Sequence, residues 1–207
     1  MRDEILDGLE RGEFHVLYQP QMTADGACMA VVEALVRWNS RNRGAVGPAD
    51  FIALAGKDGV IKELGAFVLR RACRDALNWP QRVVSVNVSG LQIQEPDFAA
   101  FVEARLRETG LAPARLEREI VESALVENFD LAEQVLTRLR RRGVKIVRDD
   151  FGAGYSSLTY LRKFPLDKLK IDRSFVQESD TLVCAAIIQG LVAIARAIGL
   201  TITAEGV

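Results

Sequence analysis

The sequence has 207 residues, of which 49% are hydrophobic and 27% are charged, and its formal net charge is −1. This composition is typical of a globular protein with one domain. It lacks the basic excess of a nucleic-acid-binding protein, so we expect no nucleic-acid polymer as a partner. The single histidine, His15, excludes a histidine-based zinc site and a Ser-His-Asp relay. Any hydrolytic chemistry would have to use carboxylates, lysine and metal ions.

Hydrophobic periodicity and turn signals predict alternating strands and helices. In chain order, the first part predicts a helix at 3–11, strands at 15–22 and 28–38, a loop at 39–47 and a helix around 51–54. Asp25-Gly26 is a hairpin signal, so the first two strands are predicted to be antiparallel. The remainder predicts strands at 83–88, 116–121, 144–149, 166–171 and 201–204, and helices at 60–79, 97–109, 131–142, 158–162 and 181–198. This alternation predicts βα units and a largely parallel sheet of seven strands.

The cysteines and the apolar runs indicate the cellular location. Cys28, Cys73 and Cys184 are odd in number and lie in apolar runs, which is typical of reduced core thiols, and we predict a cytoplasmic protein. The N-terminus lacks the apolar core of a signal peptide. The longest apolar run, residues 187–200, is too short for a membrane span and contains Arg196, so we expect a buried helix there.

Polar residues lie at or near the carboxyl ends of six consecutive predicted strands. They are Glu33, Asn87, Glu119, Asp149 with Asp150, Lys170 and Glu205. In a (β/α) barrel, the carboxyl ends of the strands form the active-site face. Any one of these charges alone is as well explained by solvation, but acids within apolar runs are costly to bury unless they are paired or bind a cation. The whole set therefore predicts a site.

The residue types of this set indicate which cation would bind. Carboxylate and amide oxygens are hard ligands and favour Mg²⁺ or Mn²⁺ over zinc. The adjacent Asp149 and Asp150 would suit a bridging carboxylate and a ligand to a second ion, and paired ions commonly attack phosphoesters. Lys170 has two interpretations: it orients a water or a phosphoryl oxygen, or it forms an ion pair with one of the acids.

Motifs around these residues resemble the EAL domain family. The segment Glu33-Ala34-Leu35-Val36-Arg37-Trp38 is similar to the signature that names the family. The supporting motifs, in family order, are Tyr18-Gln19-Pro20, Val86-Asn87-Val88-Ser89, Glu119-Ile120-Val121-Glu122-Ser123, Asp149-Asp150-Phe151-Gly152, Leu169-Lys170-Ile171-Asp172-Arg173-Ser174-Phe175-Val176 and Ala204-Glu205-Gly206-Val207. The resemblance implies an α/β fold, a modified TIM (β/α) barrel with an antiparallel first strand. The family continues into one more strand and a final helix, so we expect residues 1–207 to be a single, C-terminally incomplete EAL domain.

The resemblance also implies an activity, the hydrolysis of cyclic di-GMP to linear pGpG with two Mg²⁺ or Mn²⁺ ions. By motif, the ligands of one ion are Glu33, Asn87, Glu119 and Asp149, and those of the second are Asp149 and Asp150. Lys170 would contact the catalytic water, Glu205 would support the metal and water network, and Glu122 would hold the Asp-Asp-Phe-Gly loop. Gln19, Arg37 and Asp172 resemble substrate contacts, although an amide bonded to backbone remains an alternative for Gln19.

Three further expectations accompany this interpretation. The alternative function is a degenerate EAL module that binds cyclic di-GMP or a partner protein without cutting. EAL domains commonly pair near the Asp-Asp-Phe-Gly loop, so a homodimer is expected there. Strand alternation aims Arg118 and Arg148 at the helix layer, and we expect them to reach the rim or to pair with acids such as Glu117 or Glu122, because unpaired burial is costly.

Overall fold

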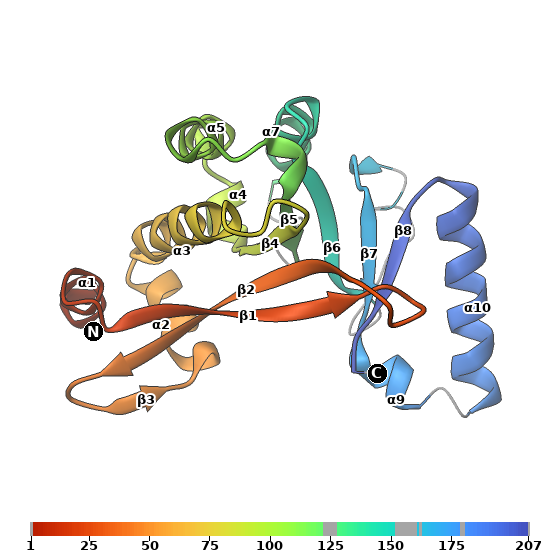
Figure 1. The fold of residues 1–207 in the computed structure, drawn as a ribbon, viewed down its shortest axis with the longest axis horizontal. Coiled ribbons are helices and arrows are strands. Elements are labelled where there is room, and N and C mark those ends of the chain that lie inside the picture. Colours follow the sequence, from red (N-terminus) through yellow and green to blue (C-terminus); the bar gives the residue numbers. More distant parts are fainter. Residues whose placement is uncertain (1, 122–127, 152–160, 162, 179–180, 207) are drawn as a thin grey trace.

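The fold is built on one curled sheet of eight strands (Figure 1). The computed structural model describes residues 2–121, 128–151, 161, 163–178 and 181–206. The strands are β1 (Phe14–Met22), β2 (Met29–Ser40), β3 (Gly44–Val46), β4 (Val83–Val88), β5 (Leu116–Ile120), β6 (Lys145–Phe151), β7 (Lys168–Ile171) and β8 (Thr201–Ala204). They are ordered β1-β2-β4-β5-β6-β7-β8, and β3 pairs with β2. The β1–β2 hairpin is antiparallel and the strands from β2 to β8 along this path run parallel, as predicted.

The helices cover the sheet mainly from one side. They are α1 (Arg2–Glu10), α2 (Pro48–Lys57), α3 (Ile61–Ala76), α4 (Gly90–Ile93), α5 (Phe98–Thr109), the 3₁₀ turn η1 (Pro113–Arg115), α7 (Phe129–Arg141), α9 (Arg173–Gln177) and α10 (Leu182–Ala197). Figure 1 shows α3, α5 and α7 on one side of the strands and α10 beside β8. Among the described residues, no helix combines the length and the apolarity that crossing a bilayer requires.

Two of the helix boundaries follow from local chemistry. The Asn128 side chain accepts a hydrogen bond from the Leu131 backbone N–H at 3.3 Å and so begins α7. Gly110 adopts φ 76°, a left-handed conformation that ends α5 at low cost for glycine. The helix predicted at 158–162 lies almost entirely outside the described residues.

The loop predicted at residues 39–47 is wrong in part. Strand β2 continues to Ser40, and β3 pairs back onto it with Trp38 opposite Val46 and Ser40 opposite Gly44. Gly44 has φ 72°, which allows the tight reversal between the two strands. A strand of three residues is too short to show an alternating hydrophobic pattern, so composition alone indicates a loop.

The two faces of the sheet differ in chemistry. On β4, Val84, Val86 and Val88 belong to the main hydrophobic core, together with residues of α3, α5 and α7. The intervening Ser85 and Asn87 point to the opposite, inner face, because successive side chains of a strand alternate. The same alternation along β5 places Glu117 and Glu119 on the inner face. The helix-covered face therefore supplies the hydrophobic core, and the concave face carries polar side chains.

Arg118 and Arg148 lie on the helix-covered face as predicted, but neither reaches the rim. They are 1% and 0% exposed, respectively. The Arg118 guanidinium carbon lies 5.5 Å from the ring centre of Phe98, and that of Arg148 lies 4.7 Å from the ring centre of Phe151. Aromatic faces attract a guanidinium, so the rings replace part of the lost hydration. The expected pairing of Arg118 with Glu117 is also wrong, because Glu117 is on the inner face and pairs with Lys168.

Replacing Arg118 with methionine is expected to leave the free energy of unfolding unchanged or to raise it by about 1–2 kcal/mol. Burial lowers the pKa of Arg118 to about 10, and its Nε and Nη1 atoms have no hydrogen-bond partner among the described residues. Chemical denaturation would measure the change. The control is Arg115→Met, which should destabilise because Arg115 donates to the carbonyl oxygens of Arg82 and Trp79. A clear loss of stability in Arg118→Met would contradict the prediction.

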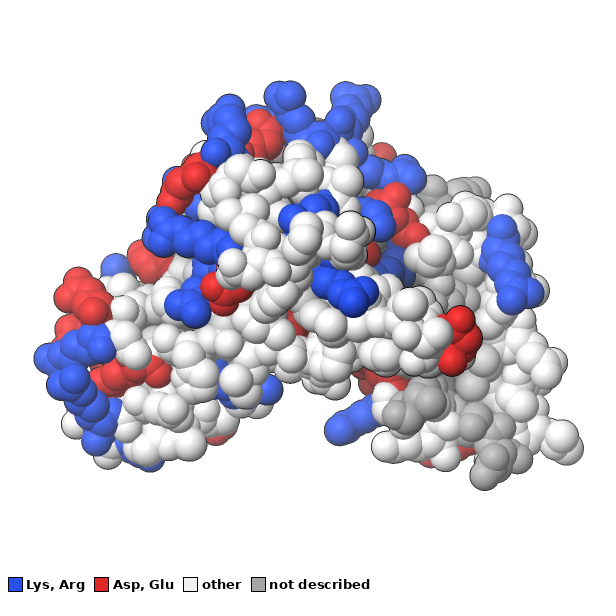
Figure 2. Space-filling view, viewed as in Figure 1, with Lys and Arg blue, Asp and Glu red and all other residues white. Residues whose placement is uncertain are grey.

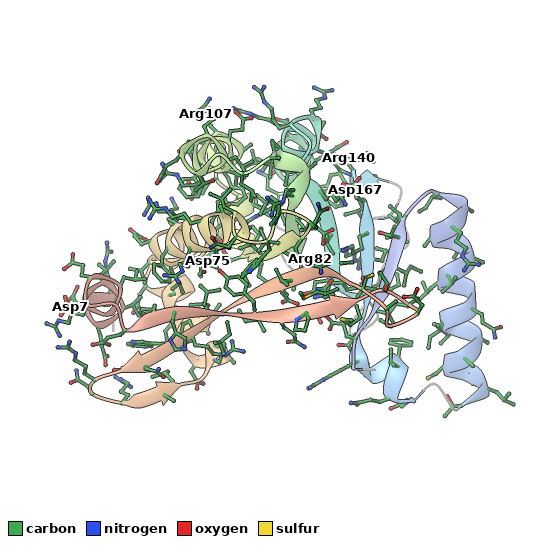
Figure 3. All side chains as sticks on the ribbon, in the orientation of Figure 1. Asp7, Asp75, Arg82, Arg107, Arg140 and Asp167 are labelled. Carbon is green, nitrogen blue, oxygen red and sulfur yellow. The ribbon has the colours of Figure 1, made fainter. Side chains whose placement is uncertain are left out.

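Surface ion pairs connect the helix layer to itself and to the sheet. Lys and Arg side chains gather over α5 and α7 on the face in Figure 2. Arg138 of α7 binds Glu103 of α5 at 3.0 Å. Arg140 binds Asp167, next to β7, at 3.0 Å, and Figure 3 labels both residues of this second pair. Exposed pairs of this kind contribute little stability each. We therefore interpret this basic region as a solvated face.

The cysteine prediction is confirmed for one residue and wrong for two. Cys73 is buried in the core, and burial raises the pKa of its thiol to about 11. Cys28 is exposed because it follows the turn of the β1–β2 hairpin. Cys184 is partly exposed, and it lies on α10, where Leu182, Val183 and Ile187 are also exposed. The predicted burial of the α10 segment therefore holds for only part of the helix, since Leu191 and Ala195 are the residues of α10 that are buried.

Candidate active site

The carboxyl ends of the strands bring the predicted acids together around one lysine. The Lys170 ammonium contacts carboxylate oxygens of Glu33 at 3.1 Å, Glu119 at 2.9 Å, Asp149 at 3.0 Å and Glu205 at 2.6 Å. These acids come from β2, β5, β6 and the residue after β8, and the side chain of Lys170 is only 2% exposed. The structure shows the ion pair that was one of the two interpretations of Lys170, and it involves four acids. The other interpretation, orientation of a water or a phosphoryl oxygen, stays a prediction.

Two amide side chains extend this cluster. Asn87 of β4 donates from Nδ2 to Glu33 Oε1 at 2.9 Å, which leaves its carbonyl oxygen as the atom suited to a cation. Gln21 of β1 donates from Nε2 to Glu119 Oε1 at 3.5 Å. The sequence interpretation missed Gln21. Its only signal was its position two residues after Gln19, which places both side chains on the same face of a strand.

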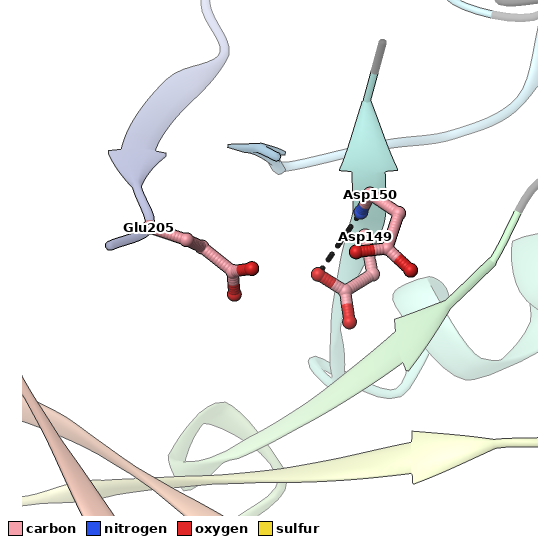
Figure 4. Close-up of side chains that lie close together, drawn as sticks. All are labelled: Asp149, Asp150 and Glu205. Carbon is pink, nitrogen blue, oxygen red and sulfur yellow. Dashed lines mark hydrogen bonds between the residues drawn. The ribbon is translucent and has the colours of Figure 1, made fainter. Parts of the chain in front are cut away.

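Asp149 and Asp150 both face the site, although adjacent residues of a regular strand point to opposite sides. Asp150 has φ 50°, an uncommon conformation for a residue other than glycine. The pairing of β6 with β7 also shifts register between Arg148 and Phe151. Carboxylate oxygens of Asp149, Asp150 and Glu205 lie within 4.8 Å of one another (Figure 4). Backbone strain at this position therefore aligns two consecutive carboxylates, as strained residues at functional sites often do.

The inner face below this cluster is also polar. The Lys168 ammonium contacts Glu117 Oε2 at 2.6 Å, and the two side chains are 11% and 1% exposed. Each precedes a residue of the cluster by two positions, so the pair forms the next layer toward the amino ends of the strands. Lys168 and Glu117 balance each other's charge, whereas Lys170 has more acids around it than it can neutralise.

Burial and crowding alter the protonation of the site. Burial raises the pKa of Glu119 to about 7; Lys170 opposes this increase, and Glu33 and Asp149 add to it. Burial likewise raises the pKa of Asp150 and of Glu205. Burial alone would lower the pKa of Lys170, but Glu119, Asp149 and Glu33 raise it well above its usual range. Lys170 is therefore a permanent cation here, and the acids retain an excess of negative charge.

The metal-free protein is expected to lose stability as pH rises from about 5 through about 7. The folded-state pKa of Glu119 lies above its usual value of 4.5, so the folded state binds the proton more tightly in this interval. The stability that this proton contributes is complete below about 4.5 and is lost as pH rises through about 7. Since one pKa unit corresponds to about 1.4 kcal/mol, the loss should be of the order of 1–3 kcal/mol.

Thermal melts in EDTA between pH 5 and pH 8 would measure this dependence. The control is Glu119→Gln, which cannot titrate and should flatten the curve over the same interval. A wild-type melting temperature that is constant or that rises from pH 5.5 to pH 7.5 would contradict the assignment of the raised pKa to Glu119.

The donor set fits a hard divalent cation. Glu33, Glu119, Asp149, Asp150, Glu205 and Asn87 offer carboxylate and amide oxygens, the atoms that Mg²⁺, Mn²⁺ and Ca²⁺ prefer. The negative charge left after pairing with Lys170 is the electrostatic condition for binding such an ion. Among the described residues, Asp149, Asp150 and Glu205 form a group of acids placed closely enough to share one ion, and the predicted supporting role of Glu205 stays a prediction.

The predicted substrate contacts lie on β1, on β2 and just after β7. Gln19 is exposed and lies directly opposite Glu33 in the β1–β2 pairing. Arg37 donates from Nη1 to the carbonyl oxygen of Val36 at 3.0 Å. Asp172 caps α9 by accepting from the Ser174 backbone N–H at 2.9 Å. Glu122 lies outside the described residues, so its predicted role in holding the loop stays a prediction.

Comparison with known proteins places this arrangement in context. The sequence model of the EAL domain family matches residues 2–207. The chain is 44% identical to the uncharacterized protein y4lL of Sinorhizobium fredii, over 100% of this chain and 25% of that protein. It is 39% identical to the cyclic di-GMP phosphodiesterase NbdA of Pseudomonas aeruginosa, over 100% of this chain and 27% of that protein. The chain thus spans about a quarter of the length of these curated relatives.

A solved structure has the same fold. The structure described as PaMucR phosphodiesterase in a c-di-GMP complex superposes with a TM-score of 0.91 and 37% sequence identity. The alignment covers 99% of this chain and 85% of that one. The likeness supports the barrel-type interpretation of the curled sheet made from the sequence.

Proposed function

Since this chain belongs to the EAL domain family, we propose that it hydrolyses one phosphodiester bond of cyclic di-GMP to give linear pGpG, with two Mg²⁺ or Mn²⁺ ions. The observation that carries the proposal is the convergence of Glu33, Glu119, Asp149 and Glu205 on Lys170, with Asp150 beside them. A site with this excess of carboxylate oxygens favours hard cations, and paired cations suit phosphoester hydrolysis.

The proposal assigns the chain's own residues to two cation positions. Glu33, Asn87, Glu119 and Asp149 would hold one ion, and Asp149 with Asp150 would hold the other, with Glu205 adjacent to both aspartates. Bound there, the ions would supply Lewis-acid stabilisation of the phosphoryl oxygens and a more acidic water. Asp149 is common to both sets, so the proposal depends on it more than on any other ligand.

Lys170 would act as a fixed positive charge and hydrogen-bond donor. Because its pKa is raised far above neutrality by Glu119, Asp149 and Glu33, which outweigh its burial, it does not serve as a base. In the proposed reaction, water adds to phosphorus, the bond from phosphorus to the ribose 3′ oxygen breaks, and that oxygen takes up a proton from solvent water. Glu205, whose pKa is raised by burial, is suited to accept the proton that the attacking water loses.

The remaining assignments concern the substrate and the assembly. Gln19, Arg37 and Asp172 would contact cyclic di-GMP, with Arg37 binding a phosphate, and Glu122 would hold the loop that follows Asp150. Arg37 would have to exchange its bond to the Val36 carbonyl for the phosphate. A homodimer that places this loop near the interface is part of the proposal.

The test is a chromatographic assay of cyclic di-GMP with the purified chain. The expected result is conversion to linear pGpG with Mn²⁺ or Mg²⁺ and no conversion in EDTA. Persistence of hydrolysis in EDTA would contradict the metal assignment. Binding of cyclic di-GMP without product, with either ion, would instead support the alternative function, a receptor module of the same family.

A further inference from the structure

The amide of Gln21 donates a hydrogen bond to the Glu119 carboxylate, and we infer that Gln21 is a positioning residue for cation binding at this site. The inference rests on the proposed function, because it takes Glu119 as a metal ligand. It adds a residue of β1 outside the motif set that identified the site, where the matching segment is Tyr18-Gln19-Pro20.

The geometry gives each oxygen of Glu119 its own donor. Lys170 Nζ contacts Oε2 at 2.9 Å, and Gln21 Nε2 donates to Oε1 at 3.5 Å. Glu119 itself is 1% exposed, so water has little access to either oxygen. A carboxylate held by one donor can rotate about its terminal bond, whereas two donors on opposite oxygens fix the plane of the group.

The backbone of β1 is adapted at this position. Gln21 lies opposite Val31, but the next residue, Met22, lies opposite Met29, so the pairing skips Ala30. Such a bulge changes the direction of the side chains next to it and is common beside active sites. The irregularity begins at Gln21, whose side chain donates a hydrogen bond to an acid of the cluster.

The amide of Gln21 brings a cost in stability. Its Oε1 atom is buried and has no hydrogen-bond partner among the described residues. A buried carbonyl without a partner typically costs more stability than a long bond of 3.5 Å returns. Reversing the amide would place Oε1 against the Glu119 carboxylate, and the two acceptor oxygens would repel each other. A purely structural role therefore does not explain the residue, whereas orientation of a metal ligand does.

The experiment compares Gln21→Met with wild type by titration calorimetry with Mn²⁺ in the absence of substrate. Methionine keeps the length of the side chain and removes the donor. Loss of an outer partner of a metal ligand typically weakens metal binding 10- to 100-fold, and the long bond predicts a value near the lower end, about 10-fold. The Mn²⁺ electron paramagnetic resonance spectrum should also change. Melting in EDTA should show that the variant is as stable as wild type or more stable.

One control and one second variant separate the possible outcomes. Gln134→Met makes the same change on the exposed face of α7 and should alter neither Mn²⁺ affinity nor stability. Gln21→Leu provides a second variant if Gln21→Met folds poorly, and excess Mn²⁺ should restore its rate while KM for cyclic di-GMP stays unchanged. Equal Mn²⁺ affinity in wild type and both Gln21 variants overturns the inference. A wild-type protein that binds no Mn²⁺ overturns the proposed function instead.

Discussion

Replacing Lys170 with methionine is expected to reduce turnover of cyclic di-GMP by at least about 10²- to 10³-fold, the loss typical for removing a donor that stabilises a reacting oxygen. The same change should lower the free energy of unfolding in EDTA by about 3–5 kcal/mol at pH 8, because four buried or partly buried carboxylates lose their common cation. The folded-state pKa of Lys170 is raised, so its stabilising contribution in the wild-type protein is complete below its usual value of 10.5, which includes pH 8. The Lys170→Met variant therefore loses the whole contribution at pH 8.

Chemical denaturation and the hydrolysis assay would measure the two effects. Mn²⁺ should recover part of the stability of Lys170→Met, because a divalent cation satisfies the same carboxylates. The matched control is Lys168→Met, since Lys168 is buried on the same face of the same strand and is paired with Glu117. It should destabilise the protein and leave the metal-dependent rate of the folded fraction near that of wild type. If the two variants keep equal rates, Lys170 has no role in the chemistry.

The substitution Asp149→Asn is expected to reduce metal-dependent hydrolysis by more than about 100-fold, since even outer partners of metal ligands change activity by 10- to 100-fold. Asparagine keeps the shape of the side chain but has a single acceptor oxygen and no charge, so it cannot bridge two cations. Stability in EDTA should be unchanged or higher, because Asp149 raises the pKa of both Glu119 and Glu205 through repulsion that asparagine would remove.

The control for this prediction is Asp167→Asn, the same chemical change in the residue just before β7. Asp167 pairs with Arg140 and accepts a hydrogen bond from the Ile146 backbone N–H at 2.9 Å. Its substitution should lower the melting temperature slightly and leave the hydrolysis rate intact. Hydrolysis by Asp149→Asn at the wild-type rate, with the same Mn²⁺ requirement, would show that Asp149 is not a ligand of the active ion.

The sequence predicted most of the fold because its strands and helices are long and separated by clear turns. It failed where an element was short or where three-dimensional packing decided the outcome. Strand β3 has three residues, too few for a periodic signal. The burial of Arg118 was not predicted because it depends on the ring of Phe98, which lies 20 positions earlier in the chain and on a different element.

The candidate site was predictable at the level of its residues and less so at the level of their geometry. Strand ends identified Glu33, Asn87, Glu119 and Lys170, and the structure brings them into contact with one another. The left-handed backbone of Asp150 has no signature in the sequence, since it depends on a register shift between β6 and β7. Gln21 was missed for the same kind of reason, because its contact with Glu119 spans 98 positions of the chain.

The opposite characters of the two sheet faces separate the folding of this protein from its chemistry. Apolar residues such as Val84, Val86 and Ile120 drive collapse on the helix-covered face, while the acids on the concave face add repulsion. Substitutions that remove one of the acids around Lys170 therefore cost the chain little in foldability. In evolutionary terms, the proposed catalysis would be easy to lose and the scaffold easy to keep, so variants without hydrolytic activity would remain available for selection as folded proteins.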